Sequence, residues 1–301
     1  MIKRTICFSS GAYLSLKDKQ LVIELAEDIT KTKKTVPIED IGVVVLDNPQ
    51  ITITQGAMVS LLENNVAIIT CDQRHHPLGL NLCLDGNDIQ SERYREQIQA
   101  TEALKKNLWQ QTIIAKIQNQ ANVLKELGID TKKMVFWARK VKSGDSENHE
   151  ARAAAYYWQN LLEQDNAFKR ERYGEYPNNF FNYSYSILRA IAARSLVASG
   201  LLPTLGIFHK NRYNAYCLAD DIMEPYRPYA DRVVLETIKK YPEIQEMTKE
   251  IKSSLLSLPV VDVKMKNATR PLQIAMGETT ASLYQCFSGE RRLIKYPILG
   301  G

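Results

Sequence analysis

The run Ile41-Gly42-Val43-Val44-Val45-Leu46 is apolar throughout and is bounded by polar residues, Glu39-Asp40 before it and Asp47-Asn48-Pro49 after it. A short continuous apolar run that ends in turn-forming residues is typical of a strand buried on both faces. This run therefore predicts a buried strand, and the segments around it decide what kind of domain the strand belongs to.

Short, partly alternating segments on both sides of this run indicate further strands. They are Arg4–Phe8, Tyr13–Leu16, Gln20–Leu25 and Val66–Thr70. Between the apolar run and the last of these strands, Ile53–Leu62 has apolar residues at helical spacing. We therefore expect a small β-rich domain with one helix, which we place at residues 1–88.

The pattern changes from about Asp85, where the stretch Asp85-Gly86-Asn87-Asp88 is rich in turn-forming residues. Long charged segments with helical periodicity follow it. They are Tyr94–Leu127, Ala151–Leu162, Tyr183–Ala198 and Asp231–Tyr241. The sequence thus predicts an α+β protein, in which the small N-terminal β-rich domain precedes a larger all-α domain at residues 89–301.

The composition sets broad limits on function. Of the 301 residues, 45% are hydrophobic and 24% charged, which is the balance of an ordinary soluble globular protein. The net charge of +5 permits a polyanionic partner without requiring one. The five cysteines include no CxxC pair, which argues against a zinc ribbon and a secreted disulfide scaffold. Without a signal peptide or a membrane-spanning run, we expect a cytoplasmic protein that does not bind membranes.

Glu150 is a first candidate for chemistry. It opens a helical segment in which Ala154, Tyr157 and Leu161 share its face at steps of three and four, and we expect this face to be buried. A buried carboxylate is costly unless it is paired or bound to a metal. A glutamate at a helix N-terminus is also favoured by the helix dipole. The spacing therefore leaves a metal ligand and a helix-end charge as open alternatives.

The chain has four histidines, of which His209 lies in a plausible site. It follows Gly206-Ile207-Phe208, and the acids Asp220, Asp221 and Glu224 lie downstream of it. Apolar residues are interleaved with these acids, which indicates that the segment is at least half buried. Carboxylates and an imidazole are suitable ligands for a divalent cation. A hydrogen-bonded structural histidine and a solvated acidic helix end remain the alternatives.

Basic residues near these segments are candidates for contacts with DNA. Lys and Arg side chains interleaved with aromatic residues suit phosphate contact together with stacking on an unpaired end. A solvated charged surface remains the alternative for any one of them. The candidates are Arg139, Lys140, Arg152, Lys169, Arg170, Arg172 and Arg189.

Four segments, in this order, resemble the successive motifs of CRISPR-associated protein one, the spacer-acquisition integrase. They are Glu150–Trp158, Asn182–Arg189, Gly206–His209 and Leu218–Pro228. A β-rich part followed by a helical part is also similar to that family, so the resemblance covers essentially the whole chain. The sequence Asp-Ile-Met-Glu-Pro-Tyr-Arg-Pro looks most like that of members from type II systems.

The resemblance implies that Glu150, His209 and Glu224 are catalytic and bind Mg²⁺ or Mn²⁺, with Asp221 as a further candidate ligand. It implies a metal-dependent DNA integrase and endonuclease that inserts foreign DNA fragments into a CRISPR array, by attack of a 3′-hydroxyl on a phosphodiester. It also implies a homodimer formed largely by the β-rich domains. In the implied hetero-hexamer, CRISPR-associated protein two bridges two such dimers.

Two other functions compete with this one. The first is a catalytically silent DNA-binding scaffold of the CRISPR adaptation complex, which the loss of a candidate metal ligand would favour, and none is lost. The second is a metallohydrolase of small phosphoesters. That activity calls for more histidines and for Asp-rich motifs that hold two metals, which the chain lacks.

Overall fold

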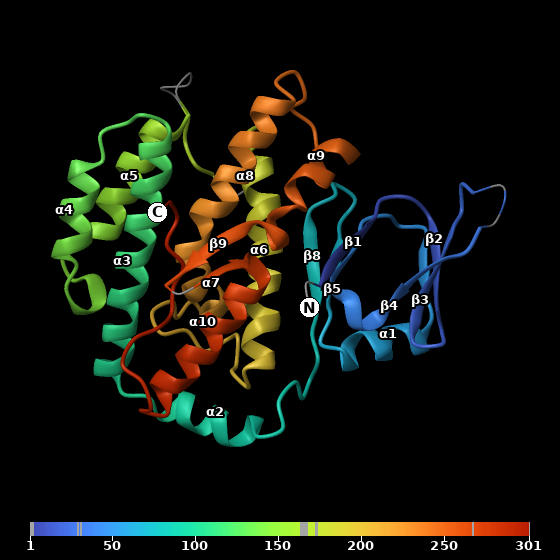
Figure 1. The fold of residues 1–301 in the computed structure, drawn as a ribbon, viewed down its shortest axis with the longest axis horizontal. Helices are drawn as coiled ribbons and strands as arrows, with labels where there is room; N and C mark the ends of the chain where they lie inside the picture. The colour runs from blue at the N-terminus through green and yellow to red at the C-terminus, as the bar shows by residue number, and fades with distance from the viewer. Residues whose placement is uncertain are drawn as a thin grey trace. The chain divides into compact units, whose positions relative to one another are not determined.

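The computed structural model describes residues 3–28, 30, 32–162, 168–171, 174–266 and 268–300. The chain divides into two compact units, Met1–Asp88 and Ile89–Gly301. Figure 1 shows that strands dominate the first unit and helices the second. This is the α+β class predicted from the sequence, with the β-rich part first.

Within the described residues, the N-terminal unit contains two four-stranded sheets and one α-helix. Its elements are β1 (Arg4–Phe8), β2 (Ala12–Lys17), β3 (Gln20–Leu25), β4 (Lys34–Pro37), β5 (Ile41–Leu46), β6 (Ile51–Ile53), α1 (Gln55–Glu63), β7 (Ala67–Cys71) and β8 (Pro77–Asn81). One sheet has the order β1-β5-β7-β8 and the other β4-β3-β2-β6.

Strand β5 is the predicted buried strand. It lies between β1 and β7 and is parallel to both, and Ile41–Val45 are buried. The core of this unit also contains Leu14 of β2, Leu21 of β3 and Leu61 of α1, all fully buried. The apolar run is therefore covered on both faces, as its sequence predicts.

The C-terminal unit is mostly helical and also contains a β-hairpin. Its elements are α2 (Gln90–Gln99), α3 (Glu102–Glu126), α4 (Lys132–Lys140), α5 (His149–Leu161), α6 (Asn178–Ala198), α7 (Cys217–Met223), α8 (Arg227–Lys240), α9 (Lys249–Leu255), β9 (Asp262–Met265), β10 (Ala268–Pro271) and α10 (Leu272–Phe287). Strands β9 and β10 pair in antiparallel orientation. The domain expected to be all α therefore contains a short hairpin that the sequence pattern did not predict.

The segment Tyr94–Leu127, expected to be one helix, forms two. Helix α2 ends at Gln99 and α3 begins at Glu102. The hydroxyl of Thr101 accepts a hydrogen bond from the backbone N–H of Leu104 at 3.2 Å. Threonine is a favoured N-cap because its side chain satisfies a backbone donor that the helix leaves unpaired. This cap starts a new helix at a point where the apolar periodicity shows no break.

A buried carboxylate links three helices of the C-terminal unit. Asp231 of α8 accepts hydrogen bonds from the hydroxyls of Tyr157 in α5, at 2.8 Å, and of Tyr185 in α6, at 2.6 Å. Burial raises the pKa of Asp231 to about 6, even though both hydrogen bonds act in the opposite direction. Because Asp231 joins α5 to α6 and α8, it helps to fix the helix that carries Glu150.

The raised pKa of Asp231 predicts a pH-dependent stability. A carboxyl with a raised pKa in the folded state stabilises the protein below its unfolded pKa, and this contribution is lost as the pH rises through the folded value. Relative to Asp231→Asn, the free energy of unfolding of the wild type should therefore fall between pH 3.8 and about 6. The expected fall is up to about 3 kcal/mol. Denaturant unfolding of both proteins measures it, and a constant difference across this range would contradict the prediction.

No helix in the described part of the chain is both long enough and apolar enough to cross a membrane.

Candidate metal centre

Glu150 projects from a helix end that the preceding turn fixes. The carboxylate of Asp145 accepts hydrogen bonds from the backbone N–H groups of His149, at 3.0 Å, and Glu150, at 2.9 Å. These are donors that the first turn of a helix otherwise leaves unpaired. Gly144, which comes just before Asp145, has a φ of +71°, in the left-handed region that favours glycine. The backbone of Glu150 is thus held in place, while its side chain remains 26% exposed.

Glu224 lies between α7 and α8, in the 3₁₀ turn Glu224–Tyr226. Pro225 interrupts the α-helical pattern here because proline has no backbone N–H. The segment that the sequence predicts to be at least half buried is buried throughout, including Asp221 and Glu224. Burial favours a higher pKa for Glu224, but the charges of Arg227 and Lys116 outweigh it and lower the pKa. Glu224 is therefore an ionised carboxylate in a buried position.

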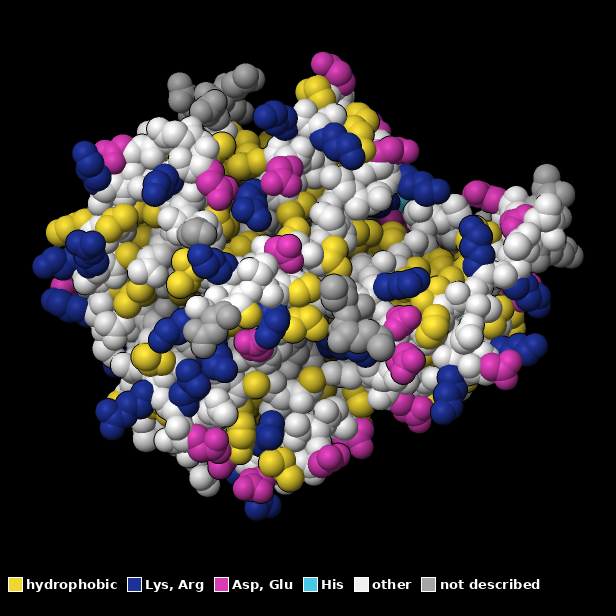
Figure 2. All heavy atoms as spheres, viewed as in Figure 1, with side chains coloured by type: hydrophobic (Ala, Val, Ile, Leu, Met, Phe, Trp, Pro, Cys, Tyr) yellow, Lys and Arg dark blue, Asp and Glu magenta, His cyan; other side chains and the backbone are white. Residues whose placement is uncertain are grey.

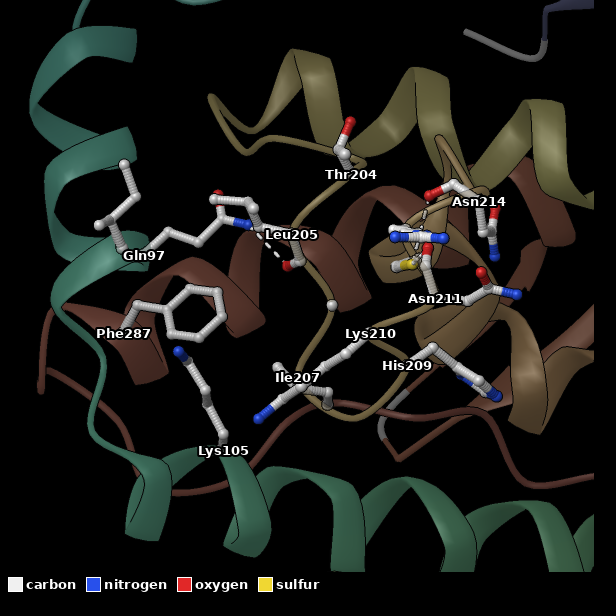
Figure 3. A pocket seen from close by; sticks show the side chains of 14 residues that line it. Gln97, Lys105, Thr204, Leu205, Ile207, His209, Lys210, Asn211, Asn214 and Phe287 are labelled. Carbon is white, nitrogen blue, oxygen red and sulfur yellow. Dashed lines mark hydrogen bonds between the residues drawn. The ribbon is translucent and has the colours of Figure 1, made fainter.

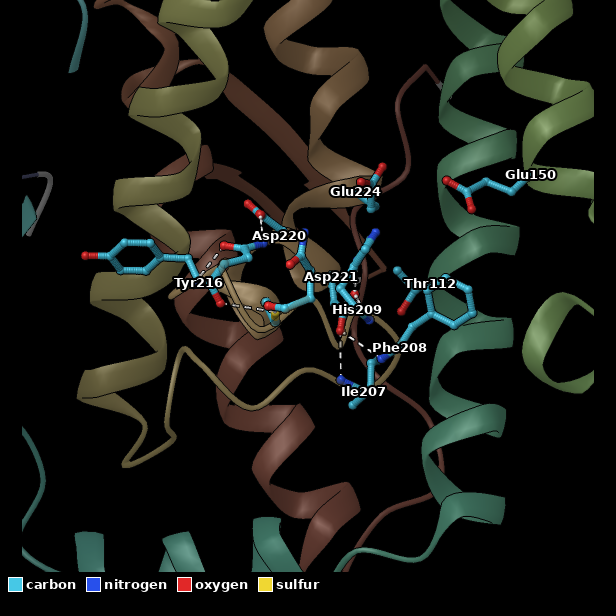
Figure 4. A network of polar contacts seen from close by, with 12 residues as sticks. Thr112, Glu150, Ile207, Phe208, His209, Tyr216, Asp220, Asp221 and Glu224 are labelled. Atoms are coloured by element: carbon cyan, nitrogen blue, oxygen red, sulfur yellow. Dashed lines mark hydrogen bonds and ion pairs between the residues drawn. The ribbon is translucent and has the colours of Figure 1, made fainter. Parts of the chain in front are cut away.

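A buried lysine joins the two carboxylates. The Nζ atom of Lys116, in the middle of α3, is 2.6 Å from Oε1 of Glu150 and 2.7 Å from Oε2 of Glu224. Figure 4 shows these two glutamates pointing toward one another from separate elements. Burial favours a lower pKa for Lys116, but the charges of Glu224 and Glu150 outweigh it and raise the pKa. The two carboxylates therefore converge on one position, which a cationic group occupies.

Asp221 fixes the orientation of His209. Its carboxylate lies 2.5 Å from Nδ1 of His209. It also accepts hydrogen bonds from the backbone N–H groups of Ile207 at 2.7 Å, Phe208 at 3.0 Å and His209 at 3.3 Å (Figure 4). The hydrogen bond to Asp221 raises the pKa of His209, against the effect of burial. With Nδ1 donating to Asp221, Nε2 is the ring nitrogen left to act as a ligand.

The loop that carries His209 requires a glycine. A Cβ atom at Gly206 would lie 2.4 Å from the carbonyl oxygen of His209 and 2.7 Å from Oδ2 of Asp221. Further along, Phe208 stacks on Trp109 of α3, with ring centroids 4.2 Å apart. Gly206 therefore allows the loop to wrap closely around the Asp221 carboxylate, and Phe208 holds it against α3.

The arrangement separates Asp221 from the two glutamates. Both oxygens of Asp221 accept hydrogen bonds from the loop around His209, whereas Glu150 and Glu224 share the ammonium group of Lys116. Asp221, which the family resemblance makes a further candidate ligand, is thus placed to orient the imidazole. Lys116 is a member of this cluster that the sequence pattern did not identify.

The donor set suits a divalent cation. Glu150 and Glu224 offer carboxylate oxygens and His209 an imidazole nitrogen, which are ligand types for Mg²⁺ or Mn²⁺. The buried Oε2 atom of Glu224 is paired with the Lys116 ammonium at 2.7 Å. No three His, Cys, Asp or Glu side chains in the described ranges already surround a metal position. The residues fit the cation provided that the Lys116 ammonium leaves the shared position.

Four of the basic residues expected to contact DNA are exposed. They are Arg139 and Lys140 in the last turn of α4, Arg152 on α5, and Lys169. Figure 2 shows Lys and Arg side chains gathered over α4, at the left edge of the face in view. Their exposure leaves these charges available to a phosphate backbone. Arg172 lies outside the described residues.

Arg170 and Arg189 are partly exposed and are bound to other side chains of the protein. Arg189 forms two hydrogen bonds with the carboxylate of Asp220, at 2.7 and 2.9 Å. Arg170 donates to the side chains of Asn178, at 2.9 Å, and Asn182, at 2.7 Å. These contacts support α6 and α7. Both guanidinium groups therefore have partners within the helical unit, and their contact with DNA stays a prediction.

A pocket of about 440 Å³ opens beside His209 (Figure 3). Basic, amide and apolar side chains line its wall. The lining residues are Gln97, Ile98, Lys105, Thr204, Leu205, Gly206, Ile207, His209, Lys210, Asn211, Arg212, Asn214, Cys217 and Phe287. Three cationic side chains, those of Lys105, Lys210 and Arg212, line this pocket, and the first two also pair with Glu102, at 3.5 and 3.0 Å. They make the wall suitable for an anionic ligand.

Comparison with solved structures identifies the fold. The chain is similar to a casposase bound to an integration product, with a TM-score of 0.81 and 17% identity over 98% of this chain and 92% of that chain. It is also similar to a chain of a Cas6-RT-Cas1–Cas2 complex, with a TM-score of 0.74 and 18% identity over 97% of this chain and 36% of that chain. The protein therefore has the fold shared by a casposase and Cas1 proteins.

Comparison of sequences identifies the family. Residues 5–257 match the family model described as CRISPR associated protein Cas1. The CRISPR-associated endonuclease Cas1 of Neisseria meningitidis serogroup C (strain 8013) is 37% identical over 262 residues, which are 85% of this chain and 83% of that relative. The chain belongs to the CRISPR-associated Cas1 family, as the resemblance of its motifs implied.

Proposed function

We propose that the protein is a metal-dependent DNA integrase, which inserts foreign DNA fragments into a CRISPR array. The observation that carries this proposal is the convergence of Glu150 and Glu224 on one cation position, beside an imidazole that Asp221 orients. Membership of a family whose relatives are named endonucleases supports chemistry on DNA. The similarity in fold to a casposase described as bound to an integration product supports strand joining in particular.

Glu150, Glu224 and Nε2 of His209 would hold Mg²⁺ or Mn²⁺. A divalent cation at this position supplies positive charge that polarises the phosphoryl group and stabilises negative charge on the attacking or leaving oxygen. Asp221 fixes the tautomer of His209 by accepting the proton on Nδ1, and so directs the lone pair of Nε2 toward the site. We therefore assign Asp221 a positioning role and the other three residues a ligand role.

The proposed reaction is a transesterification. The 3′-oxygen of the DNA fragment forms a bond to the phosphorus of a phosphodiester at the edge of a CRISPR repeat, and the bond from that phosphorus to the departing 3′-oxygen breaks. Overall, the proton of the attacking hydroxyl is transferred to the departing one. Water in place of the attacking hydroxyl would cleave DNA instead, which accounts for an endonuclease activity at the same site.

Exposed basic residues would position the DNA. Arg139, Lys140, Arg152 and Lys169 are exposed, and the pocket beside His209 adds further cationic side chains. Neutralising phosphates with such side chains releases counterions, so DNA binding should weaken as the salt concentration rises. These contacts bind the DNA backbone and do not by themselves select a sequence.

We propose that Cas2 is the protein partner, in a hetero-hexamer in which Cas2 bridges two Cas1 homodimers formed by the β-rich units. The similar chain in a complex described as containing both Cas1 and Cas2 supports the pairing. Insertion of a fragment requires two strand joinings, so two active sites at a fixed separation suit the reaction.

The test is strand joining on a supercoiled plasmid that carries a CRISPR array, with a labelled DNA fragment, the purified cognate Cas2 and Mn²⁺. We expect covalent joining that EDTA abolishes and that added Mn²⁺ restores. If the protein binds DNA but joins no strand with any divalent cation, it is instead a catalytically silent scaffold of the adaptation complex.

A further inference from the structure

We propose that Lys116 is a built-in counter-cation of the metal centre, which pairs with Glu150 and Glu224 in the metal-free protein and leaves them when a divalent cation binds. The inference rests on the proposed function, because it concerns how that same site takes up its metal. On this inference, metal binding replaces the ammonium group of Lys116 by a divalent cation and does not simply fill an empty site.

The contacts of Lys116 support this exchange. Its ammonium group lies 2.6 Å from Glu150 and 2.7 Å from Glu224, so it contacts the oxygens that a shared metal ion would use. Lys116 is 6% exposed, and the side chain of Glu224 is 3% exposed. A buried carboxylate without a positive partner is strongly unfavourable. The ammonium group therefore stabilises the two glutamates together when no metal is present.

The balance of charge gives the reason for the ammonium group to leave. Glu150 and Glu224 contribute two negative charges, while Lys116 and Arg227 contribute two positive charges, because Arg227 lies 3.0 Å from the other oxygen of Glu224. The charges of these four residues therefore cancel. A divalent cation beside the ammonium would place like charges close together at low dielectric, where they repel strongly. Ammonium and metal therefore compete for the same carboxylates.

Lys116 is the cation of this cluster that is able to move. Its ammonium is carried on a flexible, unbranched chain. Arg227 is held by a second contact, since its guanidinium lies 4.9 Å from the ring centroid of Tyr185. Withdrawal of Lys116 would leave Glu224 paired with Arg227 through one oxygen and open to the metal through the other.

The experiment is a titration of the DNA-free protein with Mn²⁺, in which free Mn²⁺ is measured by electron paramagnetic resonance. The test variant is Lys116→Met, which removes the charge and keeps an unbranched chain. The matched control is Lys125→Met, because Lys125 is an exposed lysine on the same helix. We expect Lys116→Met to bind Mn²⁺ at least about tenfold more tightly than the wild type, a difference of about 1.4 kcal/mol. Lys125→Met should bind like the wild type.

Thermal unfolding supplies a second readout. In EDTA, Lys116→Met should melt at a lower temperature than the wild type, because two carboxylates lose their counter-charge. Addition of Mn²⁺ should raise its melting temperature by more than it raises that of the wild type. Lys116→Gln, which keeps a hydrogen-bond donor, takes the place of the methionine variant if the latter does not fold, with the same expected directions.

The outcomes distinguish this inference from the proposed function. If wild-type binding is lost in Glu150→Gln while the neutral Lys116 variant binds Mn²⁺ no more tightly than the wild type, the counter-cation role is wrong and the metal site stands. If neither the wild type nor the Lys116 variant binds Mn²⁺, both the inference and the metal-dependent function are overturned.

Discussion

Glu150→Gln should lower the rate of strand joining by about 100- to 1,000-fold, the range seen when a group that stabilises the transition state is removed. Glutamine keeps the size of the side chain and removes the negative charge that Glu150 contributes beside Glu224 and Lys116. The remaining ligands would hold a divalent cation weakly. DNA affinity should change little, because the exposed basic residues proposed to bind phosphates are untouched.

The measurement compares joining of a labelled fragment to the plasmid array with DNA binding measured by fluorescence anisotropy. Glu147→Gln is the matched control, since Glu147 lies three residues earlier and its side chain, 43% exposed, pairs with Lys142. The control should join strands like the wild type. Joining by Glu150→Gln within about tenfold of the wild-type rate would show that the charge of Glu150 is not required for the reaction.

Asp221→Asn should lower joining by about 10–100-fold, the usual cost of losing the partner that orients a metal-bound histidine. The carboxylate accepts hydrogen bonds from Nδ1 of His209 and from the backbone of the loop that carries it. A carboxamide has one acceptor oxygen and adds an N–H₂ group, so it cannot accept all of these bonds. Both the tautomer of His209 and the position of its ring would then be less well defined.

The pH profile separates this positioning role from general loss of structure. Asp221 raises the pKa of His209 above its usual 6.5, and protonated His209 cannot ligate a metal. Wild-type joining should therefore increase as the pH rises through this raised pKa. In Asp221→Asn the pKa of His209 should be lower, so the acidic limb of the profile should shift to lower pH. Reduced activity with an unshifted limb would indicate that Asp221 acts on the fold of the loop alone.

Much of the β-rich unit is predictable from its sequence. Strands β1, β3 and β5 have the predicted bounds, because short apolar runs between turn-forming residues are a local signal. The hairpin β9–β10 is different, since its strands are four residues each and such a short segment carries little periodic signal. The break between α2 and α3 depends on a single capping residue, Thr101, which the apolar pattern does not reveal.

The candidate site was likewise only partly predictable from the sequence. The choice of Glu150, His209 and Glu224 rested on motifs, and the structure places both glutamates against the ammonium group of Lys116. The role of Asp221 was not predictable, because it depends on how the backbone of a distant loop folds around a carboxylate. Lys116 did leave a signal, since it lies three residues after Ile113 and four before Gln120, on the buried face of α3. A lysine on such a face needs a buried partner, although the sequence does not say which one.

The charge of a residue also says little about its contacts. Arg170 and Arg189 carry the charge expected of residues on a DNA-binding surface. Their guanidinium groups nevertheless bind Asn178, Asn182 and Asp220 within the helical unit. Arg139 and Arg152 carry the same charge and are exposed. Tertiary packing, which periodicity does not encode, separates the two groups.

The most direct test of the proposed metal centre is anomalous diffraction from crystals soaked in Mn²⁺ and measured at the manganese absorption edge. The account predicts one peak bonded to the carboxylates of Glu150 and Glu224 and to Nε2 of His209, with the Lys116 ammonium withdrawn from both glutamates. A peak at another position, or no peak at an Mn²⁺ concentration that supports strand joining in solution, would contradict it.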